Sequence, residues 1–407
     1  MPVYLQRVSE YDVTAIEKAF DAGVEHIGLD LAGKKSAVIK VNIVQPRKPE
    51  MGVSTHPAVV EAIINSLRRR GVTSITIAEG PALAVDVAKA FRESGFTSLA
   101  KRLGVKLLNL YEAPRTNVDI GYGYKDLPNV YRDEELQNYY CGYLPIPSIM
   151  LESDLYINVP KLKTHNRTAV TLSMKNQWGL LAFRERQTYH RVGLHEPICH
   201  IARAVQPHIV VVDGILGMEG NGPVFGKPRR SELIAVGNDL LETDIVGAEL
   251  MGQDLSAIEH LNKAVELGVG GWQTTVLGTP VAELAQAFEP APLGLKKKLN
   301  FYVWRNVRAC HLDDDSFQEV FRIVKRTPKY WFTFLPKFAY YVLMKRLDVV
   351  KGRGASIPEV GGRGKILLSG DCTRELLGNM EELPANVVFV PGCPPSAEGI
   401  IEAIIRM

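Results

Sequence analysis

Short apolar strands alternate with amphipathic helices along the first third of the chain. Residues 36–44 are apolar on both faces, which is typical of a central strand in a parallel sheet. Residues 54–57 then place hydroxyl side chains ahead of a proline, which is a helix start. Strands at 72–78 and 105–110 flank a second helix at 85–94. This order predicts a βαβαβ unit with right-handed crossovers, and hence an α/β fold with a doubly wound, mostly parallel sheet.

The composition is that of a globular chain with room for two or three domains. Of its 407 residues, 46% are hydrophobic and 23% are charged. The net charge of +3 is too small for a surface that neutralises many phosphates, so we expect no nucleic-acid partner. Five cysteines, an odd number, argue against a secreted disulfide framework. No signal-peptide layout or apolar run of about 18 residues is present, and we expect a cytoplasmic protein.

Changes in composition divide the chain into three expected parts. The α/β core spans 1–288 and carries an excursion or lid at 112–150, rich in Tyr, Gly, Asn and Asp. A basic, aromatic helical segment follows at 289–350, and a short α/β segment at 351–407 completes the chain. The aromatic and basic residues of 296–346 can contact an anionic membrane surface or a protein partner. Packing within a small helical subdomain is the commoner role of such aromatics.

Basic residues gather after the apolar strand that ends at Val159. Lys161, Lys163 and Lys175 belong to a stretch, 161–184, that contains no acidic residue. Strand ends that open into polar loops are where open α/β sheets place their sites. The three lysines are therefore expected to bind the phosphate or carboxylate group of a small anionic ligand. A solvated basic loop with no ligand is the alternative interpretation.

Titratable residues near this cluster suggest proton transfer. His165 has an unperturbed pKa of about 6.5, which suits a general acid/base near neutrality. Asp213 and Glu219 follow the strand at 206–212 within a glycine-rich loop, and can orient His165 or hold a divalent metal. The expected catalytic residues are Lys163, His165, Lys175 and Asp213. The expected substrate-binding residues are Asn42, Arg47, Thr55, Lys161, Asn176, Gly220 and Gly222, although Thr55 is equally explained as an ordinary helix cap.

Five blocks of the core occur in an order that resembles the domain of unknown function (DUF) family 362. They are residues 41–57, 159–165, 174–179, 212–214 and 237–252, and the resemblance spans roughly 35–280. It implies no particular reaction. Members of that family often carry ferredoxin-like motifs for two four-iron clusters, but this chain contains no Cys-x-x-Cys-x-x-Cys motif.

A stretch of about thirty residues near the end of the chain, from 370 to 401, resembles a second group of proteins. Gly370-Asp371-Cys372 and the stretch 387–398, which contains Cys393, are similar to the end of the iron–sulfur subunit of respiratory complex I and to nickel–iron hydrogenase small subunits. In those proteins the matching cysteines bind a four-iron cluster, which implies Cys372 and Cys393 as metal ligands. A cluster usually needs four thiolates. The remaining cysteines are isolated in sequence, so a cluster, a redox-active thiol pair and an inert pair all stay open.

Three functions remain in competition. The first is an enzyme that acts on a small anionic substrate through the Lys/His site, with or without a divalent metal. The second is an iron–sulfur or thiol-redox electron-transfer protein that uses Cys372 and Cys393. The third is a non-catalytic membrane-peripheral or assembly factor. The reaction class stays open between proton transfer of the isomerase type and redox chemistry.

Overall fold

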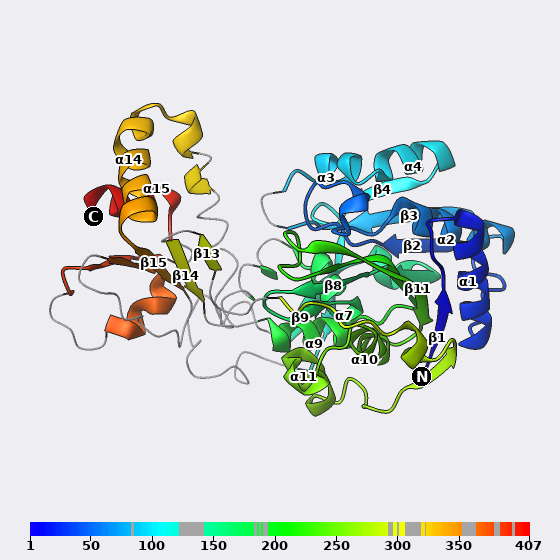
Figure 1. Ribbon diagram of the computed structural model, residues 1–407. Helices are drawn as coiled ribbons and strands as arrows, with labels where there is room; N and C mark the ends of the chain where they lie inside the picture. The colour runs from blue at the N-terminus through cyan, green and yellow to red at the C-terminus, as the bar shows by residue number, and fades with distance from the viewer. Residues whose placement is uncertain are drawn as a thin grey trace. The chain divides into compact units, whose positions relative to one another are not determined.

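The computed structural model divides into two compact units, which are described separately (Figure 1). The first unit comprises residues 1–188 and 194–291, and the second comprises 189–193 and 292–407. The structure describes residues 1–82, 85–121, 142–182, 185–186, 189, 194–291, 296–298, 301–305, 319–321, 323–351, 364–377, 383–392 and 395–407.

A large, mostly parallel sheet forms the centre of the first unit, in the order β12-β1-β11-β10-β7-β2-β3-β4. Strands β10, β7, β2, β3 and β4 run parallel to one another, and β11 runs antiparallel to both of its neighbours. The strands are β1 (Pro2–Arg7), β2 (Ser36–Lys40), β3 (Ser74–Glu79), β4 (Lys106–Asn109), β7 (Leu155–Asn158), β8 (Lys161–His165), β9 (Ala169–Thr171), β10 (Ile209–Glu219), β11 (Lys227–Gly237) and β12 (Thr275–Gly278). The predicted α/β class with a doubly wound, mostly parallel sheet is confirmed.

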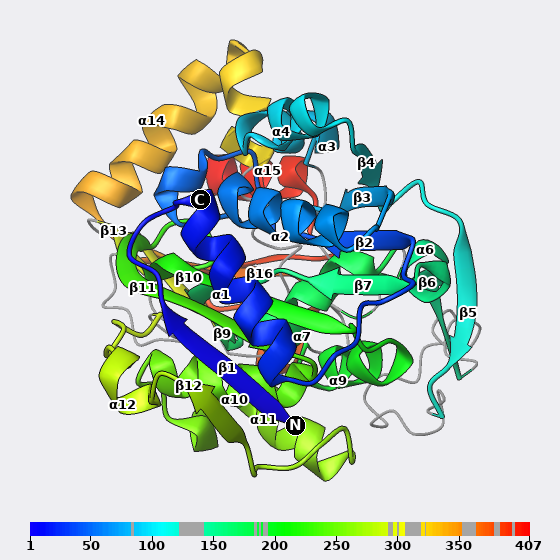
Figure 2. The same ribbon diagram turned by 90° about the vertical axis from the view of Figure 1, so that its right-hand side faces the viewer.

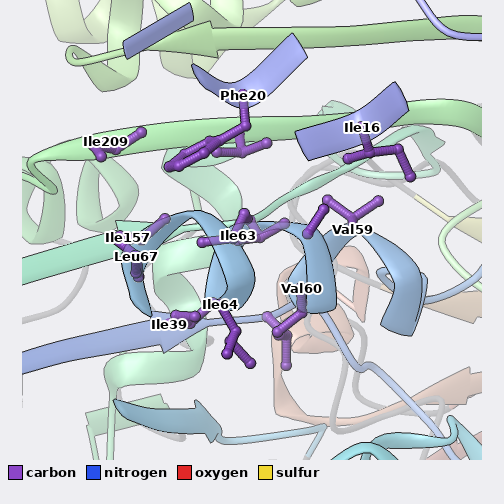
Figure 3. Packing of buried hydrophobic residues seen from close by; sticks show 14 of the residues in the cluster. Ile16, Phe20, Ile39, Val59, Val60, Ile63, Ile64, Leu67, Ile157 and Ile209 are labelled. Carbon is purple, nitrogen blue, oxygen red and sulfur yellow. The ribbon is translucent and has the colours of Figure 1, made fainter. Parts of the chain in front are cut away.

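Helices cover both faces of this sheet, with α2 above the strands and α9, α10 and α11 below them in Figure 2. The helices of the first unit are α1 (Val13–His26), α2 (Pro57–Arg69), α3 (Val87–Glu93), α4 (Phe96–Leu103), α6 (Ile149–Glu152), α7 (Ser173–Asn176), α9 (His195–Ala204), α10 (Leu240–Leu250), α11 (Glu259–Glu266) and α12 (Val281–Leu284). Figure 3 shows Phe20 of α1 and Ile63 of α2 packing with Ile157 of β7 and Ile209 of β10. Burial of such large side chains stabilises each by about 1.5–3 kcal/mol relative to exposure.

The start of α2 differs from the prediction. The side chain of His56, through Nδ1, accepts the Ala58 N–H at 3.1 Å and caps the helix, while Pro57 occupies its first position. The Thr55 hydroxyl accepts the Asn42 N–H at 2.9 Å and donates to the Val159 carbonyl at 2.7 Å. Thr55 therefore joins the segments that follow β2 and β7 instead of capping α2.

Two expected loops are strands. Pro160 interrupts β7 because it has no N–H, but the chain then resumes as β8, which pairs with β10 at Lys161 and Lys163. Residues 213–219, expected as a glycine-rich loop, continue β10 through a bulge between Gly214 and Leu216. Lys161 and Lys163 therefore lie on a buried strand and not on a solvated loop.

The expected lid at 112–150 is described only at its ends. Strands β5 (Arg115–Asp119) and β6 (Tyr143–Pro147) pair antiparallel, so the excursion begins and ends in a two-stranded ribbon. Residues 122–141 lie outside the described part of the chain.

The second unit has a sheet of its own, in the order β13-β14-β15-β16-β17. Its elements are β13 (Lys296–Lys298), β14 (Phe301–Arg305), α14 (Lys329–Met344), β15 (Leu347–Lys351), β16 (Lys365–Ser369), the 3-10 helix η6 (Asp371–Leu377), β17 (Val387–Val390) and α15 (Ala397–Arg406). Strands β14 to β17 are parallel. Residues 296–298 and 301–305, expected within a helical segment, are strands, whereas the aromatic run after 328 is a helix as predicted. Among the described helices, none is long and apolar enough to cross a membrane.

Candidate functional site

Polar side chains meet at the carboxyl ends of three neighbouring parallel strands. Lys40 ends β2, Glu79 ends β3 and Asn158 ends β7, and all three side chains are buried. Strand β8 continues from β7 and adds Lys161 and Lys163, which are also fully buried. The parallel order of the sheet brings these groups together, as expected for a site in an open α/β fold.

Lys161 forms a buried ion pair with Asp213. The Lys161 Nζ donates to Asp213 Oδ2 and to the Tyr11 hydroxyl, each at 2.8 Å. The Tyr11 hydroxyl donates to Asp213 Oδ1 at 3.0 Å, and the His56 N–H donates to Oδ2 at 2.8 Å. Burial lowers the pKa of Lys161, and the Asp213 carboxylate opposes that shift. Both carboxylate oxygens of Asp213 thus accept from protein donors, and the carboxylate holds Lys161 in place.

Lys40 and Glu79 form a second buried ion pair, with Nζ and Oε1 2.7 Å apart. Glu79 also accepts the Ile43 N–H at 2.6 Å and the Gly80 N–H at 2.7 Å. Gly179 packs directly on this pair, because a Cβ at that position would lie 2.5 Å from Glu79 Oε1 and 2.6 Å from Lys40 Nζ. A side chain at position 179 therefore has no room.

A chain of amide groups connects the strands to α7. Asn176 Oδ1 accepts from Asn42 Nδ2 at 2.8 Å and from Lys40 Nζ at 3.2 Å. Asn176 Nδ2 donates to Asn158 Oδ1 at 2.7 Å. These bonds fix the position of α7 relative to the ends of β2 and β7.

Lys163 has neutral hydrogen-bond acceptors. Its Nζ donates to Asn42 Oδ1 at 2.7 Å and to the Val53 carbonyl at 2.6 Å. Burial lowers its pKa well below the ordinary value, and the positive charge of Lys161 lowers it further. Lys163 thus forms no ion pair among the described residues, although the negative charge of Glu79 partly opposes the lowering of its pKa.

Asp244 of α10 positions the short helix α7. Its Oδ1 accepts the Ser173 N–H at 2.6 Å and also accepts from the Ser173 hydroxyl, and its Oδ2 accepts the Met174 N–H at 3.0 Å. These are the free N–H groups of the first turn. Burial raises the pKa of Asp244 to about 7. The next residues along α7 are Lys175 and Asn176, so this cap sets where the Lys175 ammonium lies.

Lys175 is partly exposed, unlike the lysines on β2 and β8. Its ammonium lies 4.8 Å from the centre of the Trp178 ring. Burial of the amine, followed by the charges of Arg186, Arg167 and Lys40, lowers its pKa to about 7. Lys175 therefore changes protonation state near neutrality.

His165 is a neutral imidazole in this environment. Its Nδ1 accepts the Arg167 N–H at 3.1 Å and the Thr168 N–H at 3.4 Å, which places the ring proton on Nε2. Burial, with the charges of Lys175 and Arg167, lowers its pKa well below the ordinary value. His165 is thus a hydrogen-bond donor at Nε2 across the physiological pH range.

Arg186 adds a further buried cation. Its Nη2 donates to the Gly80 carbonyl at 2.5 Å, Nη1 donates to the Pro81 carbonyl, and the guanidinium lies 5.0 Å from the centre of the Tyr111 ring. The ion pairs of the cluster join Lys40 to Glu79 and Lys161 to Asp213. In the part of the chain that the structure describes, Lys163, Lys175 and Arg186 form no ion pair.

Residues 37–249 match the family model described as domain of unknown function (DUF362), which covers more than half of the chain. The chain belongs to the DUF362 family. The matched segment contains Lys40, Lys163, Lys175 and Asp244, whereas Tyr11 precedes it. The predicted resemblance is thereby confirmed.

Similar proteins include the thylakoid-associated protein sll1697 of Synechocystis, which is 25% identical over 241 residues, or 57% of this chain and 68% of that one. A crystal structure of a Thermotoga maritima protein aligns with 64% of this chain and 60% of its own, at 13% identity and a TM-score of 0.37. The lactate racemase apoprotein of Thermoanaerobacterium thermosaccharolyticum aligns with 99% of this chain and 79% of its own, at 12% identity and a TM-score of 0.34. At these TM-scores, neither structure carries an argument about function.

The cluster of the DUF362 segment includes most, but not all, of the residues expected from the sequence. Asn42, Thr55, Lys161, Lys163, Asn176 and Asp213 take part in the hydrogen bonds described above. His165 and Lys175 are related to them through charge, since Lys175 lowers the pKa of both Lys163 and His165. Arg47 is partly exposed and takes part in none of these hydrogen bonds. The carbonyls of Gly220 and Gly222 accept from the Thr164 hydroxyl at 2.9 Å and from the Asn166 N–H at 3.2 Å. Thr164 and Lys163 point to opposite faces of β8, so these glycines support the strand from the other side.

Several residues of the network were not expected from the sequence. Tyr11, His56 and Glu79 all reach it from distant parts of the chain. The sequence offered one indication of the Lys40–Glu79 pair, because each residue is a polar residue at the end of an apolar strand.

The proposed metal ligands gain no support from the described residues. No group of three or more His, Cys, Asp or Glu side chains there is arranged to hold a metal ion. Glu219 accepts the Glu289 N–H at 3.1 Å and lies 3.9 Å from Arg229, while both oxygens of Asp213 are occupied. Cys393 and the Cys372 side chain lie outside the described residues, so the cluster and thiol hypotheses stay predictions. Burial raises the pKa of the Cys199 thiol to about 12, which favours the protonated form over the reactive thiolate.

Proposed function

We propose that this DUF362 protein is an enzyme that binds a small anion beside Lys175 and transfers a proton to or from it. The substrate carries a phosphate or carboxylate group. The observation that carries the proposal is the excess of positive charge in the cluster. Lys163, Lys175 and Arg186 are held together without ion-pair partners among the described residues, while Glu79 and Asp213 are each used by another lysine.

The energetic cost of this arrangement supports a ligand. Placing several cations away from water without counter-charges is unfavourable, because burial and, after it, repulsion from neighbouring positive charges lower the pKa of Lys163 and Lys175. A bound anion offsets that repulsion. Perturbed pKa values of this kind concentrate at functional sites. Among the described residues the Lys175 ammonium contacts the Trp178 ring but forms no ion pair, and a bound anion supplies that counter-charge.

Lys175 suits the acid/base role better than His165. A general base works best when its pKa lies near the operating pH, and the pKa of Lys175 is about 7. Lys175 is also partly exposed as a residue although its amine is buried, so its side chain lies close to the surface. His165 is buried and its Nδ1 is occupied by two N–H donors. We therefore assign His165 the role of a neutral donor and Lys175 that of the acid/base.

Sulfate binding at two pH values tests the proposal, because sulfate keeps a constant charge over the range used. The amine of Lys175 is largely charged at about pH 6 and largely neutral at about pH 9, since its pKa is about 7. A bound anion favours the ammonium form. We expect sulfate to bind at least about tenfold more tightly at the lower pH, with proton uptake on binding above pH 7.

Isothermal titration calorimetry in buffers of different ionisation enthalpy measures both the affinity and the proton uptake. A Lys175→Arg variant keeps its charge and should bind sulfate equally at both pH values. Absence of sulfate binding, or equal affinity of the unmodified protein at both pH values, would refute the proposal.

A further inference from the structure

Helix α14 of the second unit buries one face and exposes another that is apolar. Phe334 and Tyr341 are buried against Ile400 and Ile404 of α15, and the Tyr341 hydroxyl donates to the Met407 carbonyl at 2.8 Å. These contacts fix which side of α14 faces the core of the unit.

Large apolar side chains occupy much of the remaining surface of α14. Phe332, Leu335 and Leu343 recur at spacings that place them on one side of a helix, away from Phe334 and Tyr341. The exposed fractions are 50% for Trp331, 81% for Phe332, 40% for Leu335, 47% for Tyr340, 59% for Leu343 and 72% for Met344. Contiguous exposed apolar groups of this size mark a contact surface.

The charged residues on α14 and in the segments directly flanking it are all basic. Residues 320–347 contain no Asp or Glu, and they contain the basic residues Arg322, Lys325, Arg326, Lys329, Lys337, Lys345 and Arg346. The Lys329 and Lys345 ammonium groups lie 4.8 Å and 5.8 Å from the centres of the Tyr330 and Tyr340 rings. The charge of Arg346 is compensated, because Arg346 forms an ion pair with Asp348.

We propose that α14 lies in the plane of an anionic lipid surface, with Phe332 and Leu335 inserted among the acyl chains and its lysines at the headgroups. Apolar side chains beside basic and interfacial aromatic residues are the composition of helices that bind membranes from one side. A second copy of the chain is a poorer occupant, because an isologous contact would bring this positive surface against itself. The inference is independent of the anion site at Lys175.

Vesicle flotation with the full chain tests this assignment. We expect the protein to float with phosphatidylcholine vesicles that contain about 30% phosphatidylglycerol and not with phosphatidylcholine alone, because polybasic surfaces respond to anionic lipid. A Phe332→Ser/Leu335→Ser variant should bind at least about tenfold more weakly, since both inserted groups are lost. Phe225→Ser, at a position 62% exposed in the first unit, is the matched control and should bind normally.

A second variant separates the electrostatic contribution from the apolar one. Lys329→Gln/Lys337→Gln should also weaken binding, and should reduce its sensitivity to salt. Absence of vesicle binding by the unmodified protein would overturn the proposal, as would equal binding by the Phe332→Ser/Leu335→Ser variant. Self-association that this variant abolishes, or binding of an acidic protein without vesicle binding, would also overturn it, by assigning the surface to a second copy or to a protein partner.

Discussion

Replacing Asp213 with alanine is expected to lower the free energy of unfolding by about 3–5 kcal/mol, because it leaves the buried Lys161 without its counter-charge. Both side chains of the pair are fully buried, and Nζ and Oδ2 lie 2.8 Å apart. The substitution also removes the acceptor of the Tyr11 hydroxyl and of the His56 N–H. Urea unfolding of the two proteins near neutral pH measures the difference.

Two controls define the cause of that loss. A Lys161→Met/Asp213→Leu double variant should recover much of the stability, because removing both charges leaves no buried ion unpaired. Lys227→Ala breaks an exposed ion pair to Glu289, in which the two side chains are 74% and 57% accessible, and should cost no more than about 0.5 kcal/mol. If Asp213→Ala cost as little as Lys227→Ala, the pair would not hold β8 in place.

Replacing Lys175 with methionine is expected to weaken sulfate binding about a hundredfold near pH 6. An ammonium and an anion about 4 Å apart interact by about 4 kcal/mol at the effective dielectric constant of a protein surface, and partial exposure reduces this to about 3 kcal/mol. The Arg186 guanidinium remains, so weak binding should persist. Calorimetric titration with sulfate gives the affinity.

The free energy of unfolding of Lys175→Met shows whether its loss of sulfate binding results from unfolding. The pKa of Lys175 is about 7 in the folded protein and about 10.4 in an unfolded chain. The unfolded state therefore binds more protons between these values, and this lysine makes stability rise with pH across that window. Below pH 7 the buried charge opposes folding, so Lys175→Met should be at least as stable as the unmodified protein there.

Lys89→Met provides the matched control for the binding experiment, because Lys89 is an exposed residue of α3. It should leave sulfate affinity unchanged. Equal affinities for Lys175→Met and Lys89→Met would show that Lys175 does not contact the anion.

The arrangement of the sheet follows from local patterns in the sequence. Apolar runs, the turn ahead of Pro57 and the alternation of strands with helices are properties of neighbouring residues, and they predicted the parallel core. The strand β8 was missed because Pro160 does interrupt β7. Only the partner β10, some fifty residues further along the chain, makes it possible for the chain to resume as a strand.

Only part of the candidate site was predicted, because contacts between residues distant in the sequence are not visible in local patterns. The lysines were visible as a cluster, but their burial was not, because the groups that accommodate them come from elsewhere. Asp213 pairs with Lys161, Asn42 accepts from Lys163, and Glu79 pairs with Lys40. An acid-free stretch in the sequence indicates only that no neighbour in the chain compensates its charge; the fold determines which of its lysines acquire distant partners.

The most direct test of the anion site is the titration of the Lys175 side chain, followed by NMR on protein labelled with ¹³C at the lysine ε-carbons. Lys175→Arg identifies the signal by its loss. We predict one lysine assigned to position 175 with a pKa of about 7, which rises when sulfate is added. A Lys175 signal that titrates near the ordinary value of about 10.4, or one that sulfate leaves unchanged, would contradict the anion site.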